Sequence, residues 1–351
     1  MSEPEAADPH ITIFGAGSIG CWIGAAWLAS HLPVSFIGRE RVKREIEENG
    51  LTATDGAGRR IELRPDEVDF AMRPKALAGA DIIALCVKSD DTQAAAREIA
   101  KHASPDAVVI SFQNGVSNVD ALKAALPGRV VLAGMVPFNV AHMGNGRWHK
   151  GVAGMIWAED HAVTRALNSR IGKGPGRMQL SGDMKGVLWG KLLINLNNAV
   201  NALSGLTLLE QLSDRDYRRV VAASQIEALG ILKAAGIEPA QIGPMAPKLL
   251  PHVIAAPNFI FRRMVLKVNK IDANARSSMA DDLAAGRRTE IDHLNGEIVR
   301  LAQSLGQRAP VNEAIVGLVR EAEAGVERHW SAAELSARVL KRHKKAAGFG
   351  Y

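Results

Sequence analysis

The stretch Ile11–Gly20, ITIFGAGSIG, decides the fold predicted for this chain. Its first four residues form a mostly apolar run that predicts a strand, and residues 21–28, CWIGAAWL, predict a helix after the glycines. In this order, a glycine turn brings the backbone close to a diphosphate, and the amino end of the helix faces the phosphate charge. The alternative is a plain glycine turn. We expect a dinucleotide site built from the turn residues Gly15, Ala16, Gly17, Ser18, Ile19 and Gly20.

Length and composition indicate a globular protein with two domains. The chain has 351 residues, 47% of them hydrophobic and 23% charged, and its apolar runs are too short to span a membrane. Residues 1–10 are acidic and contain proline, so we expect a disordered lead rather than a signal peptide. The two cysteines, Cys21 and Cys86, lie in apolar surroundings and predict buried free thiols without a metal, which favours a reducing cytoplasm.

The charge pattern favours a small anionic ligand over a nucleic acid. The net charge is +6, and aromatic residues make up only 5% of the chain. The basic cluster at residues 341–345 has no accompanying nucleic-acid motif, so we expect a solvated tail over residues 341–351. We therefore expect neither a nucleic-acid nor a membrane partner. The sequence leaves the oligomeric state open, with a homodimer as one alternative.

The first half of the chain alternates strands with helices, which predicts a parallel sheet with crossover connections. Residues 52–63 predict a hairpin with Asp55-Gly56 at its turn, and residues 151–158 predict one more strand. The main predicted strands are residues 11–14, 34–37, 82–87, 108–112 and 130–136.

The second half predicts an all-helical domain because strand patterns end near residue 183. The expected boundaries are therefore 11–183 for the nucleotide-binding domain and 184–340 for the helical domain. Residues 243–259 contain several prolines and predict a connector. The predicted helices are residues 186–203, 217–235, 279–305 and 311–324.

Arg39 favours NADPH as the cofactor. It follows the second predicted strand, about 20 residues after the glycine turn, where an NAD site usually carries an acid for the ribose hydroxyl. A guanidinium there can bind a 2′-phosphate with two hydrogen bonds. The next residue, Glu40, keeps NAD open as the alternative.

Two polar strand ends predict further ligand contacts. Lys88 ends an apolar strand, and Asn114 follows the next one. The carboxyl ends of parallel strands form the ligand crevice, so a shared site is favoured over an exposed lysine and an Asn-Gly turn that are unrelated.

An unusual polar face marks the first predicted helix of the second domain. Lys191, Asn195 and Asn198 lie at positions i, i+4 and i+7 of an otherwise apolar segment. Amides with one lysine predict a partly buried stripe that binds substrate and carries a proton donor. A hydrogen-bonded seam between domains is the alternative.

The last candidate group follows residue 276. Ser278 and Asp281 resemble a helix capping box, and a helix amino end can also receive a carboxylate. Glu290 lies 12 residues after Ser278, about 18 Å along a continuous helix, unless Gly286 bends it.

These motifs resemble the ketopantoate reductases (2-dehydropantoate 2-reductases) in order and approximate spacing from about Ile11 to Ala324. The motifs are GAGSIG at 15–20, CVKSDDT at 86–92, QNG at 113–115, WGKLLIN at 189–195, and SSM with RRTEID at 277–279 and 287–292.

The resemblance implies a Rossmann-type α/β domain followed by an all-α domain like that of 6-phosphogluconate dehydrogenase. It implies NADPH-dependent reduction of 2-dehydropantoate, an anionic 2-oxo acid, to (R)-pantoate, with Lys191 as general acid. Asn114 would contact both cofactor and substrate, and Glu290 would lie at the cofactor ribose or near Lys191. The other implied substrate residues are Asn195, Asn198 and Ser278, and the other implied cofactor residues are Gly15–Gly20, Arg39 and Lys88.

Two departures from the family pattern leave the substrate open. The second substrate asparagine of many members falls on Ala199, so helical phase favours Asn198, with Asn201 as the alternative. Residues 135–140, MVPFNV, replace a loop that carries Thr and His. The alternatives are a reductase of another 2-oxo acid or an opine-like imine, and a dinucleotide sensor without catalysis.

Overall fold

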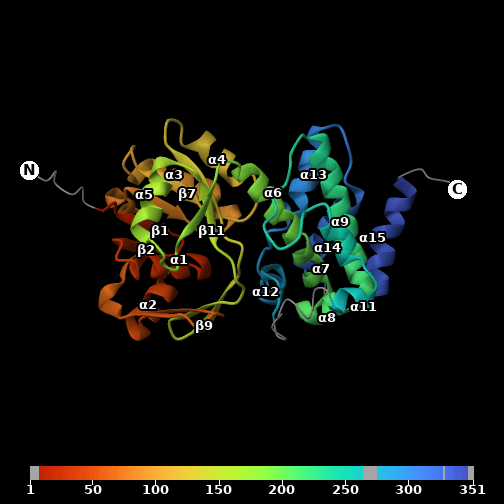
Figure 1. The fold of residues 1–351 in the computed structure, drawn as a ribbon, viewed down its shortest axis with the longest axis horizontal. Coiled ribbons are helices and arrows are strands. Elements are labelled where there is room, and N and C mark those ends of the chain that lie inside the picture. The colour runs from red at the N-terminus through yellow and green to blue at the C-terminus, as the bar shows by residue number, and fades with distance from the viewer. Residues whose placement is uncertain (1–7, 264–274, 327–328, 347–351) are drawn as a thin grey trace, which may run out of the picture. The chain divides into compact units, whose positions relative to one another are not determined.

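The structure, a computed structural model, describes residues 8–263, 275–326 and 329–346 (Figure 1). Contacts divide the chain into two units, Met1–Met184 and Lys185–Tyr351. The sequence places the domain boundary between residues 183 and 184. Of the predicted lead and tail, residues 1–7 and 347–351 lie outside the described residues.

The first unit is built on a sheet in the order β12-β11-β8-β7-β6-β1-β2-β5. Neighbouring strands are parallel except β11, which runs antiparallel to β8. The predicted α/β fold is confirmed. The strands are β1 (Ile11–Phe14), β2 (Val34–Ile37), β5 (Asp69–Ala71), β6 (Ile82–Leu85), β7 (Val108–Ser111), β8 (Val131–Met135), β11 (Ile156–Glu159) and β12 (Met178–Ser181).

Alternate residues of the central strands enter two cores, one on each face of the sheet. Ile13 packs in the core that contains Trp27, whereas its neighbour Phe14 packs in the core that contains Leu122. Since successive side chains of a strand point to opposite faces, a strand buried on both faces is largely apolar. The helices of this unit are α1 (Ser18–Leu28), α2 (Glu40–Asn49), α3 (Thr92–His102), α4 (Asn118–Ala125) and α5 (Ala162–Ile171).

A second, four-stranded sheet has the order β4-β3-β10-β9. The predicted hairpin forms its β3 (Leu51–Asp55) and β4 (Arg60–Leu63). Two further strands were not predicted, β9 (Val140–Gly144) and β10 (Arg147–Lys150). β10 pairs parallel with β3 across about ninety residues of chain. The sheet packs on α1, where the Trp22 indole donates a hydrogen bond to the Thr54 carbonyl at 3.2 Å.

The second unit is helical in the described residues, as predicted, and none of its helices is long and apolar enough to cross a membrane. The last helix includes residues 341–346, which were expected to lie in a solvated tail. The helices are α6 (Met184–Asn195), α7 (Asn197–Ser204), α8 (Leu208–Ser213), α9 (Arg215–Ala234), α10 (Leu250–Ile254), α11 (Asn258–Phe261), α12 (Ser278–Ala284), α13 (Asn295–Ser304), α14 (Pro310–Glu323) and α15 (Ala332–Ala346).

Two long helices predicted in this unit are each divided. The helix predicted over residues 186–203 ends at Asn195, and α7 begins after Leu196. The helix predicted over residues 279–305 is wrong as a continuous element, because α12 ends at Ala284 and Gly286 adopts a φ of +62°. A positive φ ends an α-helix, and glycine takes it without steric cost. The predicted connector over residues 243–259 contains α10 and the start of α11.

Candidate functional site

Two glycines of the turn have no room for a side chain. Gly15 has a φ of +105°, and a Cβ there would lie 2.7 Å from the Cys86 carbonyl carbon. A Cβ on Gly20 would lie 2.4 Å from the Gly15 oxygen. The amides of Gly15 and Ala16 both donate to the Ile37 carbonyl, at 3.0 and 2.9 Å, so the turn is tied to the end of β2.

Gly17 differs from the other two glycines because the space around it is open. No atom lies within 4 Å of a Cβ built there, and Gly17 is the N-cap of α1 with no side-chain cap. The first turn of α1 contains no acidic residue. The amides of Ser18, Ile19 and Gly20 therefore lie at an uncapped helix start beside open space, an arrangement that fits a dinucleotide diphosphate.

Arg39 and Glu40 differ in what their side chains do. Gly38 packs against the glycine turn, since a Cβ there would lie 2.7 Å from the Ala16 Cβ. The next residue, Arg39, is exposed and is the N-cap of α2. Its backbone therefore lies close to the glycine turn. The Glu40 carboxylate instead accepts a hydrogen bond from Arg44 on the next turn of α2, at 3.2 Å. This geometry favours Arg39 over Glu40 as the residue that faces the cofactor ribose.

A buried hydrogen-bond cluster joins the two polar strand ends. Ser89 Oγ donates to the Asn114 carbonyl at 3.0 Å, and Gln113 Nε2 lies 3.3 Å from the Lys88 carbonyl. Asn118 Nδ2 donates to Ser89 Oγ at 3.0 Å and also contacts the Asn114 carbonyl. The structure therefore brings the exposed side chains of Lys88 and Asn114 to one edge of the sheet, after β6 and β7.

The unusual segment after β8 contributes a buried aromatic ring. Phe138 is 3% exposed and meets the Trp22 ring edge-on at 5.0 Å between centroids. Lys150 Nζ lies 4.0 Å from the Phe138 centroid and donates to the Gly154 carbonyl at 2.6 Å. Phe138 therefore serves packing, within the segment that stands in place of a Thr- and His-bearing loop.

In the helical unit, Lys191 and Asn195 lie on α6, and Asn198 lies on α7 after the break at Leu196. The Leu196 amide still donates to the Leu192 carbonyl at 3.0 Å, so the two helices remain nearly continuous. Lys191 and Asn198 are partly buried, and Asn195 is 8% exposed. Burial lowers the pKa of Lys191 from 10.5 to about 8, because desolvation disfavours the ammonium.

Asn201 is occupied by contacts within the unit and is fully buried. Its side-chain oxygen accepts from the Ser277 amide at 2.9 Å, and its side-chain nitrogen donates to the Leu206 carbonyl at 3.0 Å. Asn198 contributes only its carbonyl to this link, accepting from Ser277 Oγ at 3.1 Å. This arrangement favours Asn198 over Asn201 as the amide available to a ligand.

The predicted capping residue is one position off. Ser277, not Ser278, is the N-cap of α12, and its Oγ accepts from the Ala280 amide at 3.2 Å. Ser277 is 1% exposed, whereas Ser278 is exposed. The sequence held this signal, because Ser277 precedes Ala280 by three residues just as Ser278 precedes Asp281. The correction frees the Ser278 hydroxyl from the capping role.

Glu290 lies outside any long helix. It is partly buried and directly precedes a short 3₁₀ turn, Ile291–His293. The estimate of about 18 Å between Ser278 and Glu290 does not apply, because it assumed one continuous helix. The Thr289 amide next to Glu290 donates to the Glu323 carboxylate of α14 at 2.7 Å, which holds this segment on the helical core.

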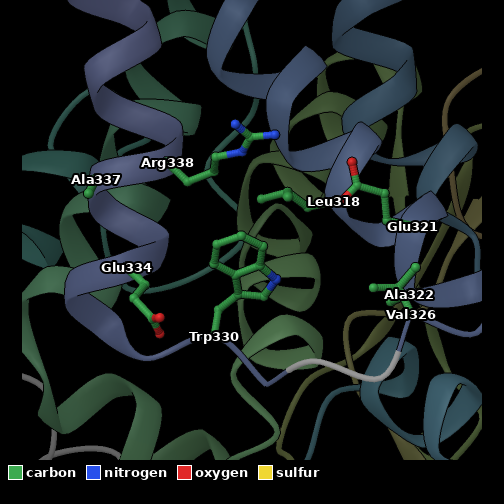
Figure 2. A pocket seen from close by; sticks show the side chains of 8 residues that line it. All are labelled: Leu318, Glu321, Ala322, Val326, Trp330, Glu334, Ala337 and Arg338. Atoms are coloured by element: carbon green, nitrogen blue, oxygen red, sulfur yellow. The ribbon is translucent and has the colours of Figure 1, made fainter.

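A pocket of about 550 Å³ lies between α14 and α15, and Figure 2 shows the Trp330 indole at its centre. The predicted site residues do not line it, and its Glu334 carboxylate caps the start of α15 by accepting from the Ser331 amide at 3.2 Å. Among the described residues, His, Cys, Asp and Glu form no group that could hold a metal. The lining residues are Leu318, Glu321, Ala322, Val326, Trp330, Glu334, Ala337 and Arg338.

Comparison with known proteins agrees with this architecture. The family described as "Ketopantoate reductase PanE/ApbA" matches residues 11–162, and its C-terminal counterpart matches residues 183–323. The 2-dehydropantoate 2-reductase of Halobacterium salinarum is 26% identical over 325 residues, which are 90% of this chain and 99% of that protein.

Solved structures place the fold in the same group. A PanE/ApbA family ketopantoate reductase from Ralstonia eutropha superimposes with a TM-score of 0.77 at 29% identity, over 90% of this chain and 99% of that one. D-mandelate dehydrogenase with NADH and anilino(oxo)acetate superimposes with a TM-score of 0.73 at 21% identity, over 90% and 99%, and shares the fold alone. The fold and glycine turn define a pyridine-nucleotide-dependent oxidoreductase. The chain belongs to the ketopantoate reductase family.

Proposed function

We propose that this protein reduces 2-dehydropantoate to (R)-pantoate with NADPH. The observation that carries the proposal is the polar face of Lys191, Asn195 and Asn198, in a chain that also has an open glycine turn for a dinucleotide. The family match over both units and the names of the relatives support the same substrate.

NADPH is the proposed form of the cofactor because of Arg39. Arg39 directly follows Gly38, which packs against the turn, whereas the Glu40 carboxylate pairs with Arg44 on α2. A planar guanidinium matches the geometry and charge of a 2′-phosphate. Lys88 and Asn114, held at the ends of β6 and β7, would contribute further cofactor contacts, with Asn114 also reaching the substrate.

Lys191 is the proposed general acid. When bound, the reduced nicotinamide supplies the hydride for the C2 carbonyl of the 2-oxo acid. Lys191 Nζ then gives its proton to the oxygen that becomes the hydroxyl. A pKa of about 8 suits this role, because the amine is still mostly protonated near pH 7 and yields its proton more readily than ordinary lysine.

The remaining predicted residues orient the substrate. Asn195, Asn198 and Ser278 present neutral amide and hydroxyl groups, which can hydrogen-bond a carboxylate or a hydroxyl without a charge penalty. Glu290 is proposed to lie close to Lys191 or the cofactor ribose. A carboxylate near Lys191 would favour the ammonium, so its approach or withdrawal would adjust the acidity of the lysine.

Measuring NADPH oxidation with ketopantoate and with several other 2-oxo acids tests the proposal. We expect kcat/KM for ketopantoate to exceed that for every other acid tested. Similar slow rates on all of them would favour a related reductase, the alternative that the altered segment around Phe138 suggests. NADPH binding without oxidation by any carbonyl acid would contradict an enzymatic role and leave a dinucleotide sensor.

A further inference from the structure

Arg276 lies next to the link between the two substrate-facing segments of the helical unit. It directly precedes Ser277, whose amide and hydroxyl bind Asn201 and Asn198 of α7. The same short segment continues into Ser278 at the start of α12. The backbone of Arg276 is therefore held beside the turn that carries Asn198, by contacts that are buried.

The Nε of Arg276 has no hydrogen-bond acceptor among the described residues. Its Nε is buried and makes no hydrogen bond, and the nearest ion-pair atom is Asp281 Oδ1 at 4.0 Å, beyond hydrogen-bond distance. The Arg276 side chain is only 36% exposed. A buried donor without an acceptor costs about 1–3 kcal/mol, so this position calls for an anion that is not part of α12.

Arg287, just after the other end of α12, offers a comparison, because its Nε has a hydrogen-bond acceptor. Its Nε donates to Asp282 Oδ1 at 2.9 Å, and its side chain is 56% exposed. The two arginines thus flank the same helix, and each has an aspartate of α12 as its nearest carboxylate. They differ in that Arg287 Nε donates a hydrogen bond and its side chain is more exposed, whereas Arg276 Nε makes only a 4.0 Å ion pair with Asp281 and its side chain is more buried.

The other proposed substrate contacts contain no guanidinium. Asn114, Asn195, Asn198 and Ser278 are neutral, and Lys191 has to give up its proton during the reaction. A 2-oxo acid carries a permanent carboxylate, and a guanidinium binds such a group with two parallel hydrogen bonds. We propose that Arg276 binds the carboxylate of the 2-oxo acid substrate, an inference that rests on the proposed function.

Pairing two variants with two substrates tests this assignment. Arg276→Gln and Arg287→Gln are compared with wild type on ketopantoate and on ketopantoyl lactone, the cyclic ester that has no free carboxylate. For Arg276→Gln we expect KM for the acid to rise roughly 10- to 100-fold, because hydrogen bonds to charged groups contribute about 1.5–3 kcal/mol. KM for the lactone and the Kd for NADPH should stay within about threefold of wild type.

Arg287→Gln is the matched control and should leave all of these values near wild type. Guanidinium ion added to Arg276→Ala should restore part of the lost kcat/KM for the acid, and not for the lactone. An equal rise in KM for acid and lactone, or a loss of NADPH affinity, would overturn the assignment. If wild type reduces ketopantoate and Arg276→Gln matches Arg287→Gln, only the role of Arg276 fails. If wild type reduces no 2-oxo acid, the proposed function fails with it.

Discussion

Replacing Lys191 by methionine should remove most of the activity and stabilise the fold at neutral pH. Burial holds the pKa of Lys191 near 8 instead of 10.5. The folded protein therefore binds this proton more weakly than the unfolded chain, so the charged lysine destabilises the fold below pH about 8. This cost fades as the pH rises from about 8 to 10.5, where the unfolded chain also loses the proton.

The structure sets the size of both effects. A pKa lowered from 10.5 to about 8 corresponds to at most about 3 kcal/mol, so Lys191→Met should gain up to that amount at pH 7 and nothing near pH 10.5. Loss of a general acid should lower kcat about 10²- to 10⁴-fold. In the wild type, kcat/KM should fall about tenfold per pH unit above pH about 8, since the free enzyme then loses the acid.

Urea unfolding at pH 7 and pH 10, together with steady-state NADPH oxidation, measures these quantities. Lys185→Met is the control, because Lys185 is exposed on the same helix. Its stability and kcat should match wild type. The reasoning is refuted if Lys191→Met keeps its kcat and only raises KM, if it is less stable than wild type at pH 7, or if wild-type kcat/KM stays flat to pH 10.

Three further predictions concern the cofactor turn and the link between α7 and α12. Arg39→Ala should weaken NADPH far more than NADH in fluorescence titrations, and equal losses would place the phosphate elsewhere. Gly17→Ala should keep the wild-type Tm, because no atom lies within 4 Å of the new Cβ, yet bind NADPH more weakly; unchanged affinity would contradict the diphosphate site. Asn201→Ala should cost about 1–3 kcal/mol in urea unfolding and raise KM for the 2-oxo acid without changing the Kd for NADPH. Asn312→Ala, which removes a buried amide bonded to Glu227 and Ser224, should lose comparable stability with KM unchanged, and a rise in both would reduce the role of Asn201 to stability alone.

Several features of the first unit could be predicted from local sequence. The mostly apolar runs at residues 11–14 and 34–37 match β1 and β2, because a strand buried on both faces needs a largely apolar stretch. The two polar residues in these runs, Thr12 and Ser35, hydrogen-bond each other at 3.1 Å. The hairpin signal around Asp55-Gly56 predicted β3 and β4 for a similar local reason. The parallel pairing of β3 with β10 left no such signal, since its partners lie about ninety residues apart.

In the second unit, periodicity predicted helices but not where they break. The helical spacing of apolar residues continues past both breaks, at Leu196 and at Gly286. One long helix and two shorter helices therefore predict the same sequence pattern. The choice between Ser277 and Ser278 was also open, because each serine stands three residues before an amide it could cap. Only packing against α7 decided it, since the Ser277 amide meets the Asn201 side chain.

The sequence by itself determined the class of fold and the chemistry of the candidate site. The glycine turn needs residues without side chains, and the amide stripe needs polar atoms on an apolar helix, so both requirements are visible in residue type and spacing. The tertiary structure decided which polar groups are already occupied. Hydrogen bonds between distant segments bind Asn201 and Ser277 within the fold, whereas the Arg276 Nε has no hydrogen-bond acceptor in the described part of the chain. No local pattern encodes such pairings.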